Sequence, residues 1–572
     1  MSRARIRMSG ARFPQRHRSR LVAVGRRSQQ VVLLAGTTGV LVGIVVAGFE
    51  RLTAEVLLET VFDQPLWVQA MAPALGLLVA AACLRAAGRH VSPATSDEYI
   101  RAFHDTGGGI ALRLVPFRLA AAIATLGSGG PLGYEGPALY TGAGIGAALQ
   151  RRMRRHFAAE DTKVLLVAGA AAGVAAIFKA PVTGLVFALE VPYQEDLARR
   201  MLLPAAISAA ASYVTFAAIV GTEPILPVAG QPPFNLVDLG GAAVVGLAAG
   251  VLARVFIVII QRAKQAATRG HPAVRAIAAG AVLATTVVLA DALGDSTLGL
   301  GPGYHALEWA LDPTHSLLAI FALGTLRVVG TAAVVGGGGT GGMFIPLVIQ
   351  GALVGRAVGG AFAVETGTLF PVVGMAAFLG AGYRVPLAAV VFVAEFTGRP
   401  GFVVPGLIAA VIAQLVMGNA SISPYQVAGR VGHIERRLRL PLGAVVNTEV
   451  RTAPPDTTVE ELFWQHLVGN RQQSVAVVDG DTYLGIARAE DVAAVDRKAW
   501  ATTRVQDIMR IDLPVADMSW TLGDAIRTIE EAAIDRIAVC DDGTFVGVIS
   551  AADLVELDEV LDQISRPPGA ER

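Results

Sequence analysis

Long apolar runs separated by short polar segments dominate the first three quarters of the chain. Six of these runs are long enough to cross a lipid bilayer as helices: they are Val31–Phe49, Leu66–Leu84, Met201–Val220, Leu239–Ile260, Ala276–Ala292 and Leu317–Val335. Others, such as Pro137–Leu149 and Val372–Ala381, are too short to cross alone. Short helices interrupted by Gly and Pro are typical of membrane transporters and channels with an inverted repeat. The pattern therefore predicts an all-α, polytopic membrane protein.

An internal repeat supports two similar halves in this apolar region. Phe178–Glu190 reads FKAPVTGLVFALE and Tyr383–Glu395 reads YRVPLAAVVFVAE, with proline, phenylalanine and glutamate aligned without gaps. Gly133–Pro137 (GYEGP) pairs with Gly342–Pro346 (GMFIP) at nearly the same offset. Shared prolines and glutamates make chance similarity between apolar segments a poor explanation.

A second repeat begins after hydropathy falls, beyond about Ser421. Val475–Asp491 and Ile537–Asp553 follow one pattern: a strand, an acidic-glycine turn, a second strand and a helix start. The expected organisation is a basic arm at 1–30, a membrane domain at 31–430 with halves at about 31–222 and 238–418, and a region at 431–572 that contains α/β modules at about 445–500 and 505–560.

Composition supports this reading, with 53% hydrophobic and 16% charged residues. The net charge of +1 suggests no nucleic-acid partner. Met1–Arg27 holds nine arginines and no acidic residue, so the positive-inside rule predicts that this arm is cytoplasmic and is retained rather than cleaved. Only Cys83 and Cys540 are present, and the histidines show no metal-ligand spacing, so neither a disulfide framework nor a metal site is expected.

Two glycine-rich breaks carry the candidate chemistry. Gly127–Pro137 (GSGGPLGYEGP) and Gly336–Pro346 (GGGGTGGMFIP) would expose backbone amides at membrane depth, which suits an anion. Helix N-termini supply partial positive charge without a fixed cation that would trap the ion. The predicted donors are the amides of Tyr134, Glu135, Gly136, Met343, Phe344 and Ile345. No nucleophile and base pair or phosphate-binding loop is recognisable, so an enzyme is not expected.

These motifs, the APVTGLVFALE segment and the SPYQ segment ending near Tyr425 resemble the CLC family of chloride channels and proton-coupled chloride antiporters, and the tail resembles a tandem pair of CBS domains. The resemblance implies a homodimer in the inner or plasma membrane, with one chloride pathway per subunit and a cytoplasmic CBS pair. It also implies that Glu135 is the gating glutamate and that the Tyr425 hydroxyl coordinates the central chloride. An interfacial aromatic is the alternative for Tyr425.

The CBS resemblance implies an adenosine-containing ligand, with Ser550 and Asp553 at contact positions of the second copy. The first copy keeps Asp491 but has Arg488 where the hydroxyl is expected. One adenine nucleotide site and a purely structural pair are both compatible with this pattern. No other cofactor is expected.

Three positions depart from the CLC pattern. The family's GSGIP segment appears as PATSD, with Ala94 or Thr95 at the serine position, so Thr95 is an anion ligand, a capping-box residue with Glu98, or both. Tyr134 replaces the arginine of GREGP, which weakens the external anion field unless another cation compensates. Val191 replaces the internal proton-transfer glutamate of the antiporters.

Because valine cannot carry a proton, Val191 favours a chloride channel gated by voltage, pH or chloride over a proton-coupled antiporter. Glu190 and Glu395 occupy equivalent repeat positions, which suggests a structural role, and Glu195 is a further candidate for an internal proton path. The sequence is also compatible with transport of nitrate or fluoride and with a membrane-tethered nucleotide sensor. An intact GGMFIP motif argues against fluoride export.

Overall fold

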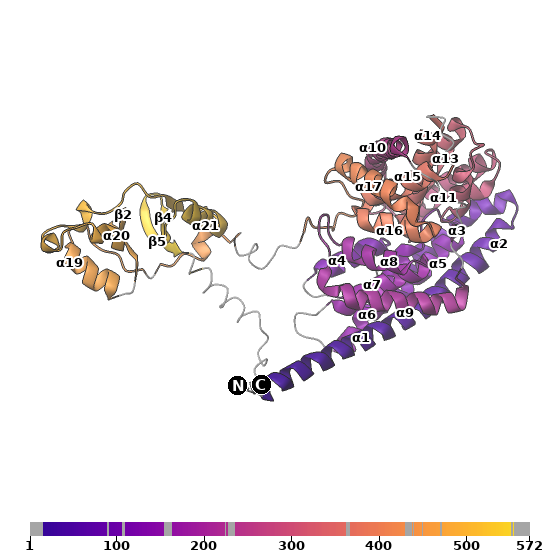
Figure 1. The fold of residues 1–572 in the computed structure, drawn as a ribbon. Coiled ribbons are helices and arrows are strands. Elements are labelled where there is room, and N and C mark those ends of the chain that lie inside the picture. The colour runs from indigo at the N-terminus through magenta and orange to yellow at the C-terminus, as the bar shows by residue number, and fades with distance from the viewer. Residues whose placement is uncertain are drawn as a thin grey trace, which may run out of the picture. The chain divides into compact units, whose positions relative to one another are not determined.

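The computed structural model describes residues 15–88, 91–105, 109–153, 163–222, 225–226, 235–361, 367–429, 438, 440–448, 450–469, 472–550 and 553. Of the predicted basic arm, residues 1–14 and the side chains before position 30 lie outside this description. The chain divides into two compact units, 1–429 and 430–572 (Figure 1).

The first unit is helical, as predicted. Its first half contains α1 (Gln15–Glu50), α2 (Glu59–Phe62), α3 (Leu66–Ala87), α4 (Thr95–His104), α5 (Val115–Gly127), α6 (Glu135–Arg152), α7 (Val164–Ile177), α8 (Pro181–Glu190) and α9 (Leu202–Val220). Its second half contains α10 (Leu236–Ala266), α11 (Pro272–Asp291), α12 (Tyr304–Leu311), α13 (Leu317–Gly337), α14 (Phe344–Ala361), α15 (Leu369–Tyr383), α16 (Pro386–Thr397) and α17 (Val403–Met417). The all-α polytopic prediction is confirmed.

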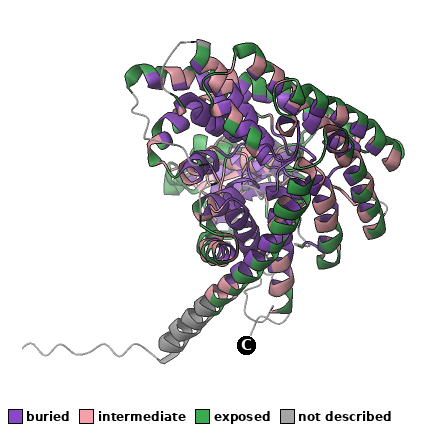
Figure 2. Cartoon of the chain, turned by 90° about the vertical axis from the view of Figure 1, so that its right-hand side faces the viewer, coloured by how far each residue is buried: buried purple, intermediate pink, exposed green. Residues whose placement is uncertain are grey.

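Seven helical stretches of the described residues are long and apolar enough to span a membrane. Six coincide with the predicted runs, and the seventh is Pro400–Met417. Figure 2 shows buried residues concentrated inside the unit and exposed residues on its outer helices. The shorter helices α7 and α15 are buried along their whole length. Since they have no lipid-facing surface, these two helices form the protein core and need no spanning length.

Paired glycines bring these buried helices into close contact in both halves. In the first half, an added Cβ at Gly142 of α6 would collide with the carbonyl of Gly169 in α7. In the second half, Gly351 of α14 has the same relation to Gly374 of α15. Only residues without a side chain allow the two backbones to lie this close together. The repeat therefore extends from sequence to packing.

Each half also caps a helix of the other half. Glu190, at the end of α8, accepts hydrogen bonds from the Leu387 and Ala388 amides of α16 at 3.2 and 2.8 Å. Glu395, in α16, accepts bonds from the Val182 and Thr183 amides of α8 at 3.0 and 2.6 Å. A carboxylate at a helix N-terminus satisfies free amides and complements the helix dipole. The structural role expected for this pair agrees with these contacts.

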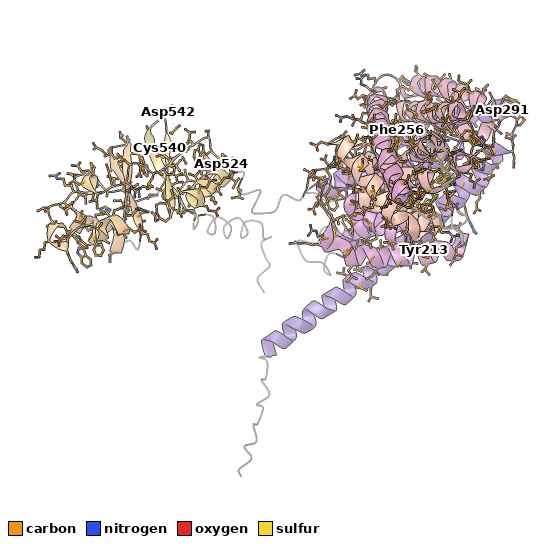
Figure 3. All side chains as sticks on the ribbon, turned by 45° about the horizontal axis from the view of Figure 1, so that its top comes forward. Tyr213, Phe256, Asp291, Asp524, Cys540 and Asp542 are labelled. Carbon is orange, nitrogen blue, oxygen red and sulfur yellow. The ribbon has the colours of Figure 1, made fainter. Side chains whose placement is uncertain are left out.

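The second unit is an α/β unit with a five-stranded sheet in the order β1-β2-β5-β4-β3. The strands are β1 (Ser474–Asp479), β2 (Thr482–Arg488), β3 (Val515–Asp517), β4 (Arg536–Asp541) and β5 (Thr544–Ser550). Its α-helices are α19 (Val459–Glu461), α20 (Ala489–Ala493) and α21 (Leu522–Glu531). The two predicted strand pairs, β1–β2 and β4–β5, are antiparallel. Cys540 lies in β4 (Figure 3) and is a free thiol. Cys83 in α3 is also a free thiol.

Candidate anion pathway

The two glycine-rich motifs meet in the interior of the first unit. Gly133 and Gly342 exchange backbone hydrogen bonds of 2.8 and 2.7 Å and form an isolated antiparallel bridge. Two helices start directly after this bridge, α6 at Glu135 and α14 at Phe344. Their free amides therefore face one region from opposite halves of the repeat, which creates a favourable site for negative charge.

The carboxylate of Glu135 occupies this region. Glu135 is only 1% exposed, and its Oε1 accepts a hydrogen bond from the Phe344 amide at 2.6 Å. Its Oε2 is buried without a hydrogen-bond partner among the described residues. A Cβ at Gly133 or Gly342 would overlap the Glu135 carboxyl group in this position, and a Cβ at Gly342 would also lie 2.7 Å from the Gly136 amide nitrogen. Glu135 thus binds the Phe344 amide, which the sequence predicts to be a hydrogen-bond donor to the anion.

A third helix start lies against the same region. Thr95 is the first residue of α4, and its Oγ1 would be 2.7 Å from a Cβ added at Gly136. The Thr95 side chain is fully buried and its hydroxyl has no partner in the described structure. The capping-box alternative for Thr95 is wrong: the N-cap is Ala94, without a side-chain cap bond, and Glu98 pairs with Arg118 at 3.0 Å.

Two polar residues near Glu135 were not predicted as ligands. Tyr383 and Ser96 line the same cavity as Met343, the residue before the Phe344 amide that binds Glu135. Tyr383 is 2% exposed and is the last residue of α15. Ser96 lies within PATSD, directly after Ala94 and Thr95, the two positions predicted to match the family's serine. In the sequence, Tyr383 stands out only as the aromatic residue that opens the second repeat segment.

Tyr425, the tyrosine predicted to bind the central chloride, lines a cavity of about 800 Å³ together with Tyr383, Met343 and Ser96. Tyr425 is 42% exposed, so Tyr383 is the more deeply buried of the two hydroxyl groups. Arg85, Lys264 and Arg275 also line this cavity, and Lys264 pairs with Asp97 at 2.6 Å. Basic side chains around a cavity raise the local concentration of anions.

The Phe344 ring packs against aromatic side chains from both repeat segments. Its centroid lies 4.6 Å from Phe178, 4.7 Å from Phe392 and 5.3 Å from Phe187. The amide of Phe344 binds Glu135 while its ring joins this cluster. The packing of the ring holds the amide in place, and Met343 and Ile345 flank it as buried residues.

Tyr134 supplies no cation at the position of the family's arginine. It is 3% exposed, packs edge-on against Phe49 with ring centroids 6.0 Å apart, and its hydroxyl has no partner among the described residues. A buried arginine, Arg327 of α13, donates hydrogen bonds to the carbonyl oxygens of Leu298, Leu300, Gly301 and Pro302. The bond to Leu300 measures 3.1 Å and the bond to Pro302 measures 2.7 Å. Arg327 is thus a buried cation of the second half that is held by backbone carbonyl oxygens.

Val191 is buried at the end of α8, next to the capping Glu190. The loop after it is held by Gln426, whose Nε2 donates to the Val191 carbonyl at 2.8 Å and to the Tyr383 carbonyl at 2.7 Å. Glu195, the further candidate for an internal proton path, has a side chain that is 69% exposed and pairs with Arg384 at 3.3 Å. Glu195 is therefore already held in an ion pair.

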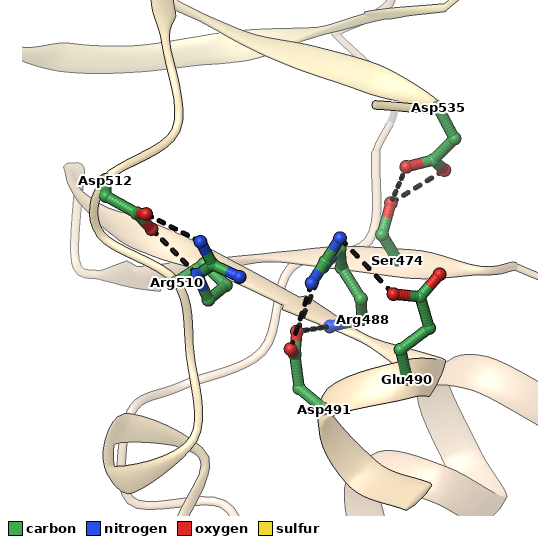
Figure 4. A network of polar contacts seen from close by, with 7 residues as sticks. All are labelled: Ser474, Arg488, Glu490, Asp491, Arg510, Asp512 and Asp535. Carbon is green, nitrogen blue, oxygen red and sulfur yellow. Dashed lines mark hydrogen bonds and ion pairs between the residues drawn. The ribbon is translucent and has the colours of Figure 1, made fainter. Parts of the chain in front are cut away.

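In the second unit, the predicted nucleotide contacts bind neighbouring residues, and Figure 4 shows those around Asp491. Arg488 donates to both carboxylate oxygens of Asp491 at 3.2 Å. The hydrogen bonds with Asp491 raise the pKa of Arg488. In the second copy, the Ser550 hydroxyl donates to Asp553 at 2.7 Å. Ser474 of the first copy donates to Asp535 of the second copy at 2.8 Å.

The membrane unit has two similar halves whose glycine-rich helix starts meet around a buried glutamate. This arrangement is that of an ion-transport protein. A family model described as voltage gated chloride channel matches residues 75–418, and the CBS domain model matches residues 442–498 and 505–559. The chain belongs to the CLC family and carries a tandem pair of CBS domains.

Related sequences include proteins named H(+)/Cl(-) exchange transporter ClcA. The one from Salmonella arizonae is 30% identical over 329 residues, which cover 54% of this chain and 67% of that relative. The one from Salmonella paratyphi B is 29% identical over the same length and the same shares of each chain.

Solved structures share the fold. A CLC-type fluoride/proton antiporter matches with a TM-score of 0.61 and 24% identity, over 70% of this chain and 98% of the other. A slow cyanobacterial Cl-/H+ antiporter matches with a TM-score of 0.60 and 20% identity, over 68% and 94%. A eukaryotic CLC transporter matches with 0.57 and 18% identity, over 93% and 98%.

Proposed function

We propose that this protein exchanges chloride for protons across a membrane. The observation that carries the proposal is the bond between the Glu135 carboxylate and the Phe344 amide, at 2.6 Å. An ionised Glu135 competes with chloride for this donor, whereas a protonated Glu135 loses its charge and releases the site. Anion occupancy and side-chain protonation then alternate at one place. Exchange follows from this alternation if protons reach Glu135 from the opposite side.

The relatives support exchange better than the channel function predicted from Val191. The ClcA proteins carry the name H(+)/Cl(-) exchange transporter, and one is 30% identical to this chain. Val191 remains the observation that favours a channel, because a buried valine blocks direct proton transfer at that position. Water or another titratable group can replace a glutamate in a proton path, so exchange is compatible with Val191.

Chloride is the proposed anion. The amides of Glu135, Gly136, Met343, Phe344 and Ile345, with the hydroxyl groups of Thr95, Tyr383 and Tyr425, are the proposed ligands. Amide and hydroxyl donors bind a large monovalent anion without a fixed cation. The intact Phe344 motif argues against fluoride.

We further propose a homodimer whose N-terminal arm and CBS pair are cytoplasmic. The nine arginines before position 28 support this orientation through the positive-inside rule. Light scattering of the detergent-solubilised protein tests the dimer, and proteolysis of the CBS region in sealed, right-side-out vesicles tests the orientation. A monomeric mass would contradict the dimer, and cleavage of the CBS region by protease added outside would contradict the orientation.

Adenine nucleotide binding to the CBS pair is a separate proposal, limited to the second copy. In the first copy the hydroxyl position is taken by Arg488, which pairs with Asp491 and Glu490, whereas the second copy keeps a hydroxyl there, Ser550, beside Asp553. Titration of the full chain with ATP, compared with the Asp553→Asn variant, tests it. Equal binding by both proteins would remove Asp553 from the site.

The experiment that tests exchange measures chloride efflux from liposomes with a simultaneous external pH electrode, with a potassium ionophore to clamp the voltage. Chloride efflux that drives protons into the vesicles against their gradient is the expected result. Chloride efflux without uphill proton movement would favour the channel. No anion flux would favour a membrane-tethered nucleotide sensor.

A further inference from the structure

Proton-coupled exchange, if this protein performs it, requires a route from the cytoplasm to Glu135. Glu135 is 1% exposed, so solvent water does not reach its carboxyl group directly. The titratable groups nearby are mostly committed to other contacts. Glu190 caps α16, Asp97 pairs with Lys264, and Glu195 pairs with Arg384. An exchange-competent proton donor must therefore come from elsewhere.

His104, the last residue of α4, lies beside the segment that follows Val191. Its Nε2 is 2.7 Å from the carbonyl oxygen of Pro192. A carbonyl only accepts, so Nε2 carries the hydrogen and Nδ1 of the neutral ring is the proton acceptor. The ring packs edge-on against Phe103 and Tyr193, with centroid distances of 5.1 and 5.5 Å. Its orientation is therefore fixed by contacts on three sides.

The helix that carries His104 leads to the anion pathway. α4 has ten residues, Thr95–His104, and spans about 15 Å at about 1.5 Å per residue. Its first residue, Thr95, lies against Gly136 and has an unpaired, buried hydroxyl. Between them, the buried Tyr99 hydroxyl donates to the Ala188 carbonyl of α8 at 2.8 Å. One short helix thus connects the Pro192 loop with the residue next to Glu135 and places polar groups along the way.

We propose that His104 is the cytoplasmic proton-transfer residue of this exchanger, in place of a carboxyl group at position 191. Nδ1 takes a proton from hydronium in the cytoplasm, and the imidazolium then releases a proton toward Glu135 and returns to the neutral ring. Each cycle leaves His104 unchanged and adds one proton to Glu135. Histidine suits this step because its ordinary pKa, about 6.5, lies within the physiological range.

The charges that face His104 come from several elements. Lys163, which precedes α7, donates to the Phe103 carbonyl and its Nζ lies 5.6 Å from the Phe103 ring. Burial and, to a smaller extent, the charge of Lys163 lower the pKa of His104, whereas the bond with the Pro192 carbonyl acts in the opposite direction. Asp105 follows His104 in sequence and acts electrostatically on Lys163. Tyr193 is the neighbouring titratable group in the loop after α8.

The test compares coupled fluxes in liposomes for the wild type, His104→Gln and the control Glu308→Gln, which changes an exposed carboxylate of α12. Glutamine keeps an N–H donor for the Pro192 carbonyl but does not ionise, so a purely structural role would survive the change. We expect His104→Gln to keep chloride flux and lose at least about 90% of proton flux, while Glu308→Gln keeps both. The proton flux of the wild type should rise as the internal pH falls from about 8 to 5, and that of His104→Gln should not respond.

A rescue variant separates proton transfer from packing. Val191→Glu in the His104→Gln background places a carboxyl group one residue before Pro192, and we expect it to restore proton flux. Proton flux that persists in His104→Gln with an unchanged response to internal pH overturns the inference. If His104→Gln loses both fluxes and Val191→Glu does not restore them, His104 has a structural role and the inference is also overturned. A wild type that moves chloride without protons would instead overturn the proposed exchange.

Discussion

Replacing Glu135 is the sharpest test of its proposed place in the anion pathway. In the structure, Oε1 of Glu135 accepts the Phe344 amide at 2.6 Å, so chloride must displace the carboxylate to use this donor. Glu135→Ala removes the competitor, and Glu135→Gln replaces it by a neutral acceptor of almost the same shape. Both variants should therefore bind chloride more tightly than the wild type.

The magnitude follows from the strength of that hydrogen bond. A bond to a charged group contributes about 1.5–3 kcal/mol and a neutral one about 0.5–1.5 kcal/mol. At about 1.4 kcal/mol per tenfold change in affinity, Glu135→Ala should lower the apparent Kd for chloride by about 10- to 150-fold. Glu135→Gln replaces the charged acceptor by a neutral one, which weakens the hydrogen bond by about 1–1.5 kcal/mol. The apparent Kd for chloride should therefore fall by about 5- to 12-fold in Glu135→Gln.

Isothermal titration calorimetry of chloride into the purified protein measures these values, in a buffer whose anion is too large for the site. Glu308→Gln, which changes an exposed carboxylate of α12 in the same way, is the matched control and should leave the Kd unchanged. Flux measurements should show chloride movement that no longer depends on pH in Glu135→Ala. An unchanged or higher Kd in both Glu135 variants would refute the competition between carboxylate and chloride.

Three further changes test other parts of the site. Glu395→Ala should destabilise the protein by about 2–4 kcal/mol, because the Val182 and Thr183 amides lose a charged acceptor, and an unchanged thermal unfolding midpoint in detergent would contradict the cap. Gly136→Ala should reduce chloride flux at least about tenfold, because its Cβ would lie 2.9 Å from the Gly342 Cα, whereas Gly48→Ala, with open space around it, should not; equal fluxes would argue against the close approach. Tyr383→Phe should raise the chloride Kd by about 2- to 12-fold, the worth of one neutral hydrogen bond, and a larger effect from Tyr425→Phe would restore Tyr425 as the principal hydroxyl ligand.

The parts of the site that depend on backbone geometry were predictable from the sequence. Glycine is the only residue that permits the approach of Gly133 and Gly342, so the repeated motif indicates where the two halves meet. Glu190 and Glu395 were recognisable because a repeat places the same residue type at both ends of a symmetric contact. A short stretch of sequence is enough to predict these contacts because the two halves of the membrane unit pack in the same way.

Contacts between side chains from distant elements were not predictable. Tyr383 and Ser96 come from α15 and α4, and only the folded chain brings the two residues to one cavity. The TxxE pattern at Thr95 indicated a capping box, but the ion pair of Glu98 with Arg118 removes one of its partners. Pro400–Met417 was not recognised as a span. Pro405 and Gly406 interrupt its apolar pattern, although both residues are buried in the fold.

The exchanged caps of α8 and α16 have a consequence for how the protein is made. While the ribosome is still synthesising the second half, the α8 amides of Val182 and Thr183 have no Glu395 to bind, because that residue follows more than two hundred positions later. Uncapped amides at a helix start are costly in a membrane. The first half therefore waits in an incomplete state, and its final packing is postponed until the second half has been inserted.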